Sequence, residues 1–382
     1  MMRKILFVCC LSFCLQVNAA QLSIISPTSL NRLMQDIGKI MVQRFPLLFA
    51  NRPLTHVEKI QMGHDIVQLN NLFLRAKPYI DKKSITYQIS LQFALEHLTH
   101  ASNAFAENDF DYVKQRLHHL RSICVSCHTQ DTKLRTLFAD TSREHFDNDY
   151  SFAEFNYTTR NYEVAMIYYD KHLLSERPKS ELEIIQPLQR LITIYTQLFN
   201  DPAKGAKKLY KYVTLAHHSA TTKAYLEASI AGLKILAADG VSGASHIDFK
   251  TLEHYVDRYL GRFDLTPIVI YSTPQEEVSR VWLRGLLFHY LNANPAQQDI
   301  PKILYWLSIC DRAIGYDFDF SLADYYLKAC VLKFSSHPFA KHCYDEYKAY
   351  ITAFYTRPTE TIFVPIEIHR ELEMLRLAIE NK

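Results

Sequence analysis

Apolar residues recur along this chain at intervals of three and four positions, which is the spacing of one buried face of an α-helix. Before residue 140 the pattern predicts four helices, at about 29–49, 55–77, 85–105 and 109–128. Thr55 followed by Glu58 indicates a capping box at the start of the second helix, and Lys77-Pro78 indicates its end. Because helices of similar length with short connections favour antiparallel neighbours, we expect an up-and-down four-helix bundle.

The same spacing predicts which side of each helix is buried. In the first helix the apolar stripe includes Leu33, Met34, Ile37, Ile40 and Met41. In the second helix we expect burial of Val57, Ile60, Val67, Leu69, Leu72 and Phe73.

From residue 141 onward the pattern predicts helical hairpins. The clearest lies at 156–171, where a tyrosine, a short turn and Tyr162-x-x-Ala165 resemble the tetratricopeptide repeat. Further turns are indicated at Asp201-Pro202, Asn294-Pro295, Ser336-His337-Pro338 and, within a helix pair, at 240–243. These turns lie farther apart than the roughly 34 residues of a standard repeat, so we expect degenerate repeats stacked as an α-solenoid.

Two segments interrupt the helical pattern. Residues 266–271 and 361–365 combine proline with β-branched residues and are expected to be extended. Thr273-Pro274-Gln275-Glu276 then predicts a new helix with Pro at its first position. A closing helix at about 367–380 is expected to cap the stack.

Composition agrees with an all-α fold. Apolar residues make up 48% of the 382 residues, with only 9 Gly but 24 Tyr and 22 Phe. We therefore predict an all-α protein with an N-terminal four-helix bundle over 21–140 and a C-terminal α-solenoid of helical hairpins over 141–382. The net charge of +3 shows no basic surplus that would indicate nucleic acid as a partner.

Residues 1–20 have the pattern of a cleavable signal peptide. Arg3-Lys4 is a short basic region, an apolar stretch runs from Ile5 to Val17, and small residues precede the cleavage point near Ala19. No later apolar run approaches the 20 residues of a transmembrane helix. We expect an exported, periplasmic protein without a transmembrane segment.

Cys124-x-x-Cys127-His128 is the attachment pattern of c-type haem. Two thiols at this spacing can reach the two vinyl groups on one edge of a haem, and the adjacent histidine can bind the iron as an axial ligand. The motif therefore predicts one covalent haem c, held by Cys124 and Cys127. Covalent haem attachment takes place in the periplasm, which agrees with the predicted export.

Other interpretations of the cysteine pair are weaker. A thioredoxin-type redox pair belongs in a βαβ context, whereas the flanking sequence is helical. A structural zinc site needs four ligands, and no second CxxC or CxxH is present. Coincidence is the third interpretation.

A four-helix pattern with CxxCH near the end of its last helix, and a methionine early in its first, resembles the class II c-type cytochromes, the cytochrome c prime group. The resemblance covers about residues 25–140. It implies that Cys124 and Cys127 are thioether anchors, that His128 is the proximal iron ligand, and that Met34 is a candidate sixth ligand. The residues that follow His128, Thr129-Gln130-Asp131, depart from the commonest ending in this family, so the subfamily stays open.

Met34 also has a simpler interpretation, because a methionine on an apolar stripe often only fills the core. Met41 and Met62 are alternative ligands. Weaker alternatives are the nearby histidines, since exposed helix faces often carry this residue: His64, His97, His100, His118 and His119.

The sixth ligand separates two hypotheses about function. With Met34 bound, both axial positions are filled and the site favours electron transfer to a redox partner protein that the repeat region docks. Without it, a pocket opens to NO, CO or O2, and the protein binds or senses a gas. A third hypothesis is a repeat scaffold without haem. HExxH, GxSxG, P-loop and GxGxxG motifs are all absent, so no enzymatic activity is predicted.

Three cysteines follow the motif. Cys330 and Cys343 lie at similar distances from the predicted turn at Ser336-His337, which places them on facing helices. A disulfide between them is one option, and two buried reduced cysteines are the other. Cys310 would then have no cysteine left with which to form a disulfide within the chain.

Overall fold

The computed structural model describes residues 29–49, 52–128, 141–215, 219–240, 247–261, 272–293, 295–314, 321–355 and 364–380. Within these ranges the protein is all-α and contains no strand, which confirms the predicted fold class. The predicted signal peptide over 1–20 lies outside these ranges. So do the segment 266–271 and most of 361–365, both predicted to be extended.

The described α-helices contain between 10 and 25 residues. The first eight α-helices are α1 (Leu30–Phe49), α2 (His56–Ile80), α3 (Ile85–Ala106), α4 (Phe110–His128), α5 (Asp149–Thr158), α6 (Tyr162–Leu174), α7 (Glu181–Thr193) and α8 (Pro202–Val213). The rest are α9 (Ala220–Ala238), α10 (Phe249–Tyr259), α11 (Pro274–Asn292), α12 (Ile300–Ile314), α13 (Ala323–Lys333), α14 (Phe339–Phe354) and α15 (Ile366–Glu380). A 3₁₀ turn (Arg143–His145) precedes α5, and a π-helical turn (Ile194–Leu198) extends α7.

The predicted helix starts are confirmed by their caps. Thr55 and Glu58 form the capping box of α2, and Thr273 forms another with Glu276 at the start of α11. The predicted end of α2 at Lys77-Pro78 is wrong, because the helix continues to Ile80. Proline lacks the amide hydrogen of a helix interior, but Pro78 comes so close to the end that only the last turn loses a bond.

The buried face of α2 also differs from the prediction. Leu69, Leu72 and Phe73 are buried as expected, but the side chains of Val57 and Val67 are 74% and 60% exposed, and Ile60 is exposed as well. The buried side instead follows an alternation of four and three positions through Met62, Ile66, Leu69, Phe73, Ala76 and Ile80. α2 therefore carries apolar residues on two sides, and its contacts with α1 and α3 bury only one of them.

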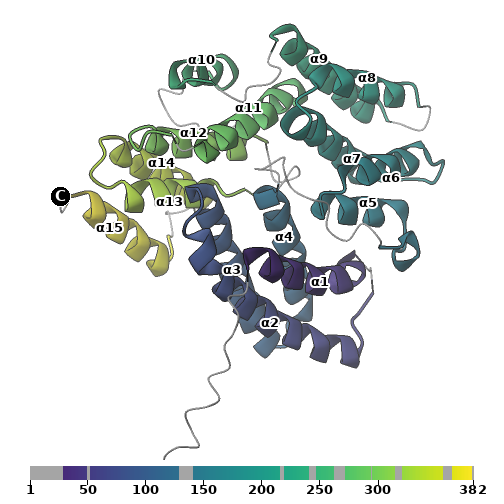
Figure 1. Cartoon of the computed structure of the whole chain (residues 1–382), viewed down its shortest axis with the longest axis horizontal. Coiled ribbons are helices and arrows are strands. Elements are labelled where there is room, and N and C mark those ends of the chain that lie inside the picture. The colour runs from purple at the N-terminus through teal and green to yellow at the C-terminus, as the bar shows by residue number, and fades with distance from the viewer. Residues whose placement is uncertain are drawn as a thin grey trace, which may run out of the picture.

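The helices follow one another around an arc (Figure 1). α1–α4 lie together at its lower centre, and α1 packs against α4 as well as against α2. From α5 to α9 the chain rises along one side, and α11 to α15 return along the other. Consecutive helices form most of the contacts, as in the predicted hairpins.

The arc closes because α3 contacts both α11 and α13. Ser84, the N-cap residue of α3, donates a hydrogen bond of 2.6 Å from its Oγ to Oδ1 of Asn292. Further along α3, the hydroxyl of Tyr325 donates to the carboxylate of Glu96. Helix α3, near the start of the described chain, therefore lies beside helices α11 and α13 from its later part.

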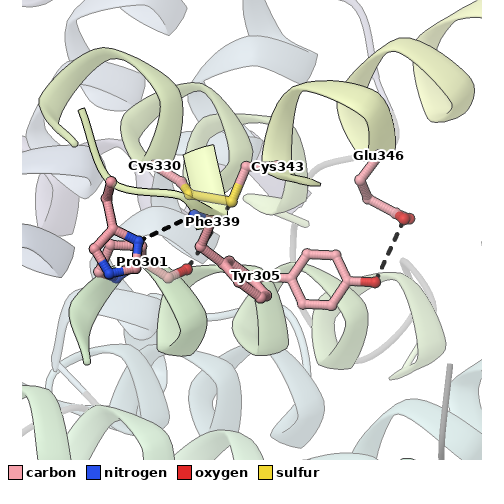
Figure 2. Close-up of a disulfide and its surroundings, with 7 residues drawn as sticks. Pro301, Tyr305, Cys330, Phe339, Cys343 and Glu346 are labelled. Carbon is pink, nitrogen blue, oxygen red and sulfur yellow. Dashed lines mark hydrogen bonds between the residues drawn. A yellow bond between two sulfur atoms is a disulfide. The ribbon is translucent and has the colours of Figure 1, made fainter. Parts of the chain in front are cut away.

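Cys330 and Cys343 form a disulfide across the hairpin of α13 and α14, with their Cα atoms 6.2 Å apart. Figure 2 shows this disulfide beside Pro301 and Tyr305 of α12. Cys310 is a free, buried cysteine of α12. The sequence left open a disulfide or two reduced cysteines at Cys330 and Cys343, and the structure contains the disulfide.

Candidate functional site

Cys124 and Cys127 lie near the C-terminal end of α4. Residues three positions apart share one side of a helix, so both side chains point the same way. Both are free and half-buried. His128 is the last residue of α4, and its side chain lies outside the described part of the structure.

The two cysteines line an apolar cavity that is partly open to solvent. Five helices form the wall: α1, α2 through Phe73, α3 through Leu91 and Ala94, α4, and α5.

Met34 lines the same cavity as Cys124 and Cys127, although it lies three helices earlier in the chain. Met41 also lines it, two turns farther along α1. Met62 is buried but does not belong to the described wall of the cavity. The structure thus brings two of the three candidate methionines to the motif cysteines.

Burial raises the pKa of the Cys124 thiol to about 11 and that of the Cys127 thiol to about 12. The positive charge of Arg160 opposes this rise without cancelling it. Both groups are therefore neutral thiols near pH 7. Because reactive thiolates occur where the thiol pKa is lowered, these surroundings do not favour a catalytic redox pair.

Helix α5 forms one wall of the cavity through Phe155, Thr158 and Thr159. The Thr158 hydroxyl donates to the carbonyl of Glu154 at 2.8 Å, and the Thr159 hydroxyl donates to the carbonyl of Phe155 at 2.9 Å. These bonds satisfy both hydroxyl groups within the helix. The two threonines therefore interrupt the apolar wall very little.

A buried ionic network holds α4 against α5. The guanidinium of Arg121, one turn before Cys124, contacts the carboxylate of Glu154, which is fully buried. Glu154 also accepts a hydrogen bond of 2.5 Å from the hydroxyl of Tyr169 and pairs with Arg190 of α7 at 3.3 Å. A buried carboxylate with several partners of this kind fixes the position of its helix.

None of the candidate histidines belongs to the wall of the cavity, as far as the described residues define it. His64 and His100 are exposed. Burial lowers the pKa of His97 and of His118 to about 3, and it lowers the pKa of His119 as well. These three side chains are therefore neutral parts of the packing near pH 7.

The contribution of α5 is the part of the site that the sequence did not indicate. The hairpin of α5 and α6 is correctly predicted from the tyrosines around its turn, but that local pattern does not say which distant helix α5 contacts. The one available signal was the run of apolar residues around Phe155, which is equally typical of any buried helix.

Within the described ranges, no three side chains of His, Cys, Asp or Glu converge on one point as metal ligands would. In the same part of the chain, no helix combines the length and the apolar character needed to cross a bilayer. No known protein family, curated protein or solved structure matches this chain.

Proposed function

We propose that this protein is a monohaem c-type cytochrome that transfers electrons, with haem c attached through Cys124 and Cys127. One observation carries the proposal. The two motif cysteines and Met34, which the family resemblance names together as haem-site residues and which lie far apart along the chain, line a single apolar cavity.

The residues around this cavity suit a haem. Cys124 and Cys127 would hold the haem as thioethers, which are neutral and therefore compatible with an apolar wall. Once bound, haem supplies an iron that accepts and donates one electron. The apolar side chains around it exclude water, and a methionine ligand raises the reduction potential of the iron.

The roles of the axial residues come from the motif and from position. His128 is the proximal ligand that the motif and the family resemblance imply. Met34 is the proposed sixth ligand, because it faces the cavity from α1 while the cysteines face it from α4. With both positions filled, the site favours electron transfer over gas binding.

The rest of the proposal concerns architecture and location. We take α1–α4 as the four-helix bundle of 21–140, which the packing of α1 against both α2 and α4 supports. We take α5–α15 as a degenerate tetratricopeptide-like solenoid over 141–382 that docks a redox partner protein. The signal-like pattern over 1–20 supports export to the periplasm.

Gas binding is the second candidate, and one observation favours it. The cavity is apolar and part of it opens to solvent, so an iron without a sixth protein ligand would be accessible to CO or NO. The third hypothesis, a scaffold without haem, gives the cysteines no role beyond packing.

An optical comparison of three methionine variants separates the first two candidates. The electron carrier predicts a low-spin spectrum that is lost in Met34→Ala and kept in Met41→Ala, which alters the same cavity wall. Met62→Ala is the control for loss of a buried methionine elsewhere. A high-spin spectrum in the unaltered protein that shifts on adding CO, and that Met34→Ala leaves unchanged, would support the gas binder instead.

A further inference from the structure

The candidate cavity is not built by the predicted bundle region alone. Helix α5 lies beyond residue 140, in the part of the chain assigned to the repeats, yet Phe155 forms part of the cavity wall. The side chain of Phe155 is 1% exposed, so protein encloses it on its other sides.

Phe155 is held in place by a small aromatic cluster. Its ring centroid lies 5.1 Å from that of Phe146 and 6.3 Å from that of Phe152, with the Phe152 ring nearly parallel. Val42 of α1 packs on the same cluster and also lines the cavity. The cluster therefore connects the cavity wall on α1 with the wall on α5.

The two ends of α5 are anchored independently of the cavity. At its start, the Asn148 side chain accepts a hydrogen bond of 2.8 Å from the amide of Ser151. At its end, the backbone amide of Asn161 donates to the backbone carbonyl of Asn156 at 2.7 Å. Arg160, just before it, is in a left-handed conformation (φ 70°). Between these ends, Glu154 binds Arg121 of α4. These contacts set the position of Phe155 without involving the cavity.

We propose that α5 is an integral wall of the haem site, and that Phe155 is a positioning residue that shields the haem from water. The proposal rests on the function proposed above and deepens it, since it gives the repeat region a direct part in tuning the iron. Shielding by Phe155 raises the reduction potential, because an apolar wall disfavours the charge of the oxidised iron.

The test compares reduction potentials of the full-length, haem-loaded protein. Phe155→Ala opens the wall to water, so its potential is expected to fall below that of the unaltered protein. Phe155→Leu keeps an apolar side chain of similar bulk and is expected to restore most of the potential. Phe288→Ala is the matched control, because Phe288 of α11 is equally buried but lies outside the described cavity wall.

Each outcome has a definite meaning. A lower potential in Phe155→Ala, recovery in Phe155→Leu and an unchanged potential in Phe288→Ala support the proposal. Equal potentials in all four proteins overturn it, even if Phe155→Ala unfolds at a lower temperature. If Phe155→Ala does not fold, Phe155→Thr takes its place, and an unchanged potential there overturns the proposal as well. A chain that carries no haem at all refutes the proposed function, and this inference with it.

Discussion

Arg121 of α4 and Glu154 of α5 form a buried ion pair across the predicted boundary between the two regions of the chain. The two residues are 33 positions apart, and the connection between their helices includes residues outside the described ranges. Charged groups enter a protein interior at a high cost unless they are paired, so separating α4 from α5 would leave a buried charge without its partner. Helices α4 and α5, which lie on either side of this predicted boundary, are therefore joined beside the motif cysteines.

Glu154→Gln should destabilise the protein strongly. The change removes the buried negative charge that pairs with Arg121 and Arg190, and removing one partner of a buried ion pair typically costs about 3–5 kcal/mol of unfolding free energy. Urea unfolding followed by circular dichroism measures this loss. Lys341→Met is the control, because the Lys341–Asp345 pair is 73% and 54% exposed and should contribute almost nothing. Equal unfolding midpoints for the two variants would contradict the importance of the buried pair.

The disulfide between Cys330 and Cys343 should stabilise the hairpin of α13 and α14. It closes a short loop, with a sequence separation of 13, for which the loss of chain entropy in the unfolded state amounts to about 3 kcal/mol. Adding a reductant should lower the urea midpoint of the unaltered protein. It should have no such effect on the double variant Cys330→Ala/Cys343→Ala. Alkylation of the denatured, unreduced protein should leave both cysteines unlabelled, and labelled Cys330 would show that the bond does not form.

Acid should destabilise the protein in part through His97. Burial, with smaller contributions from Arg116 and the neighbouring histidines, lowers the pKa of His97 to about 3 in the folded state. An unfolded histidine has a pKa of about 6.5, so between these two values the unfolded chain binds a proton that the folded chain does not. Stability is therefore lost as the pH falls through this window.

The size of this effect can be isolated with one variant. Each such proton changes the unfolding free energy by up to about 1.4 kcal/mol per pH unit. His97→Gln has no proton to bind, so its stability should fall less steeply between pH 6.5 and pH 4 than that of the unaltered protein. The measurement is urea unfolding at a series of pH values. Parallel slopes for the two proteins would show that His97 takes up its proton at the same pH in the folded and the unfolded state, which would contradict the lowered pKa.

The sequence predicted local structure better than tertiary contacts. Caps such as Thr55 with Glu58 depend on residues three positions apart, so the sequence contains everything they need. The buried side of α2 was mispredicted because Val57 and Val67 are as apolar as the residues that face the core, and only packing against α1 and α3 selects one side.

In the candidate site, too, the local features were predicted from the sequence and the tertiary contacts were not. The CxxCH spacing identifies Cys124 and Cys127 from local sequence, and the apolar stripe of α1 places Met34 on a buried side. The wall contributed by Phe155 depends on how α5 docks on α4, and that docking rests on the Arg121–Glu154 pair. No local pattern indicates which of the many arginines Glu154 will bind.

Mass spectrometry of the mature protein, made in cells with a c-type cytochrome maturation system, tests the central claim most directly. We predict that the intact chain carries the mass of one haem, and that a digest locates this haem on the peptide with Cys124 and Cys127. The double variant Cys124→Ala/Cys127→Ala should lose the haem, whereas Cys310→Ala should keep it. An intact chain without added mass, or a haem that denaturation removes, would contradict the assignment of this protein as a c-type cytochrome.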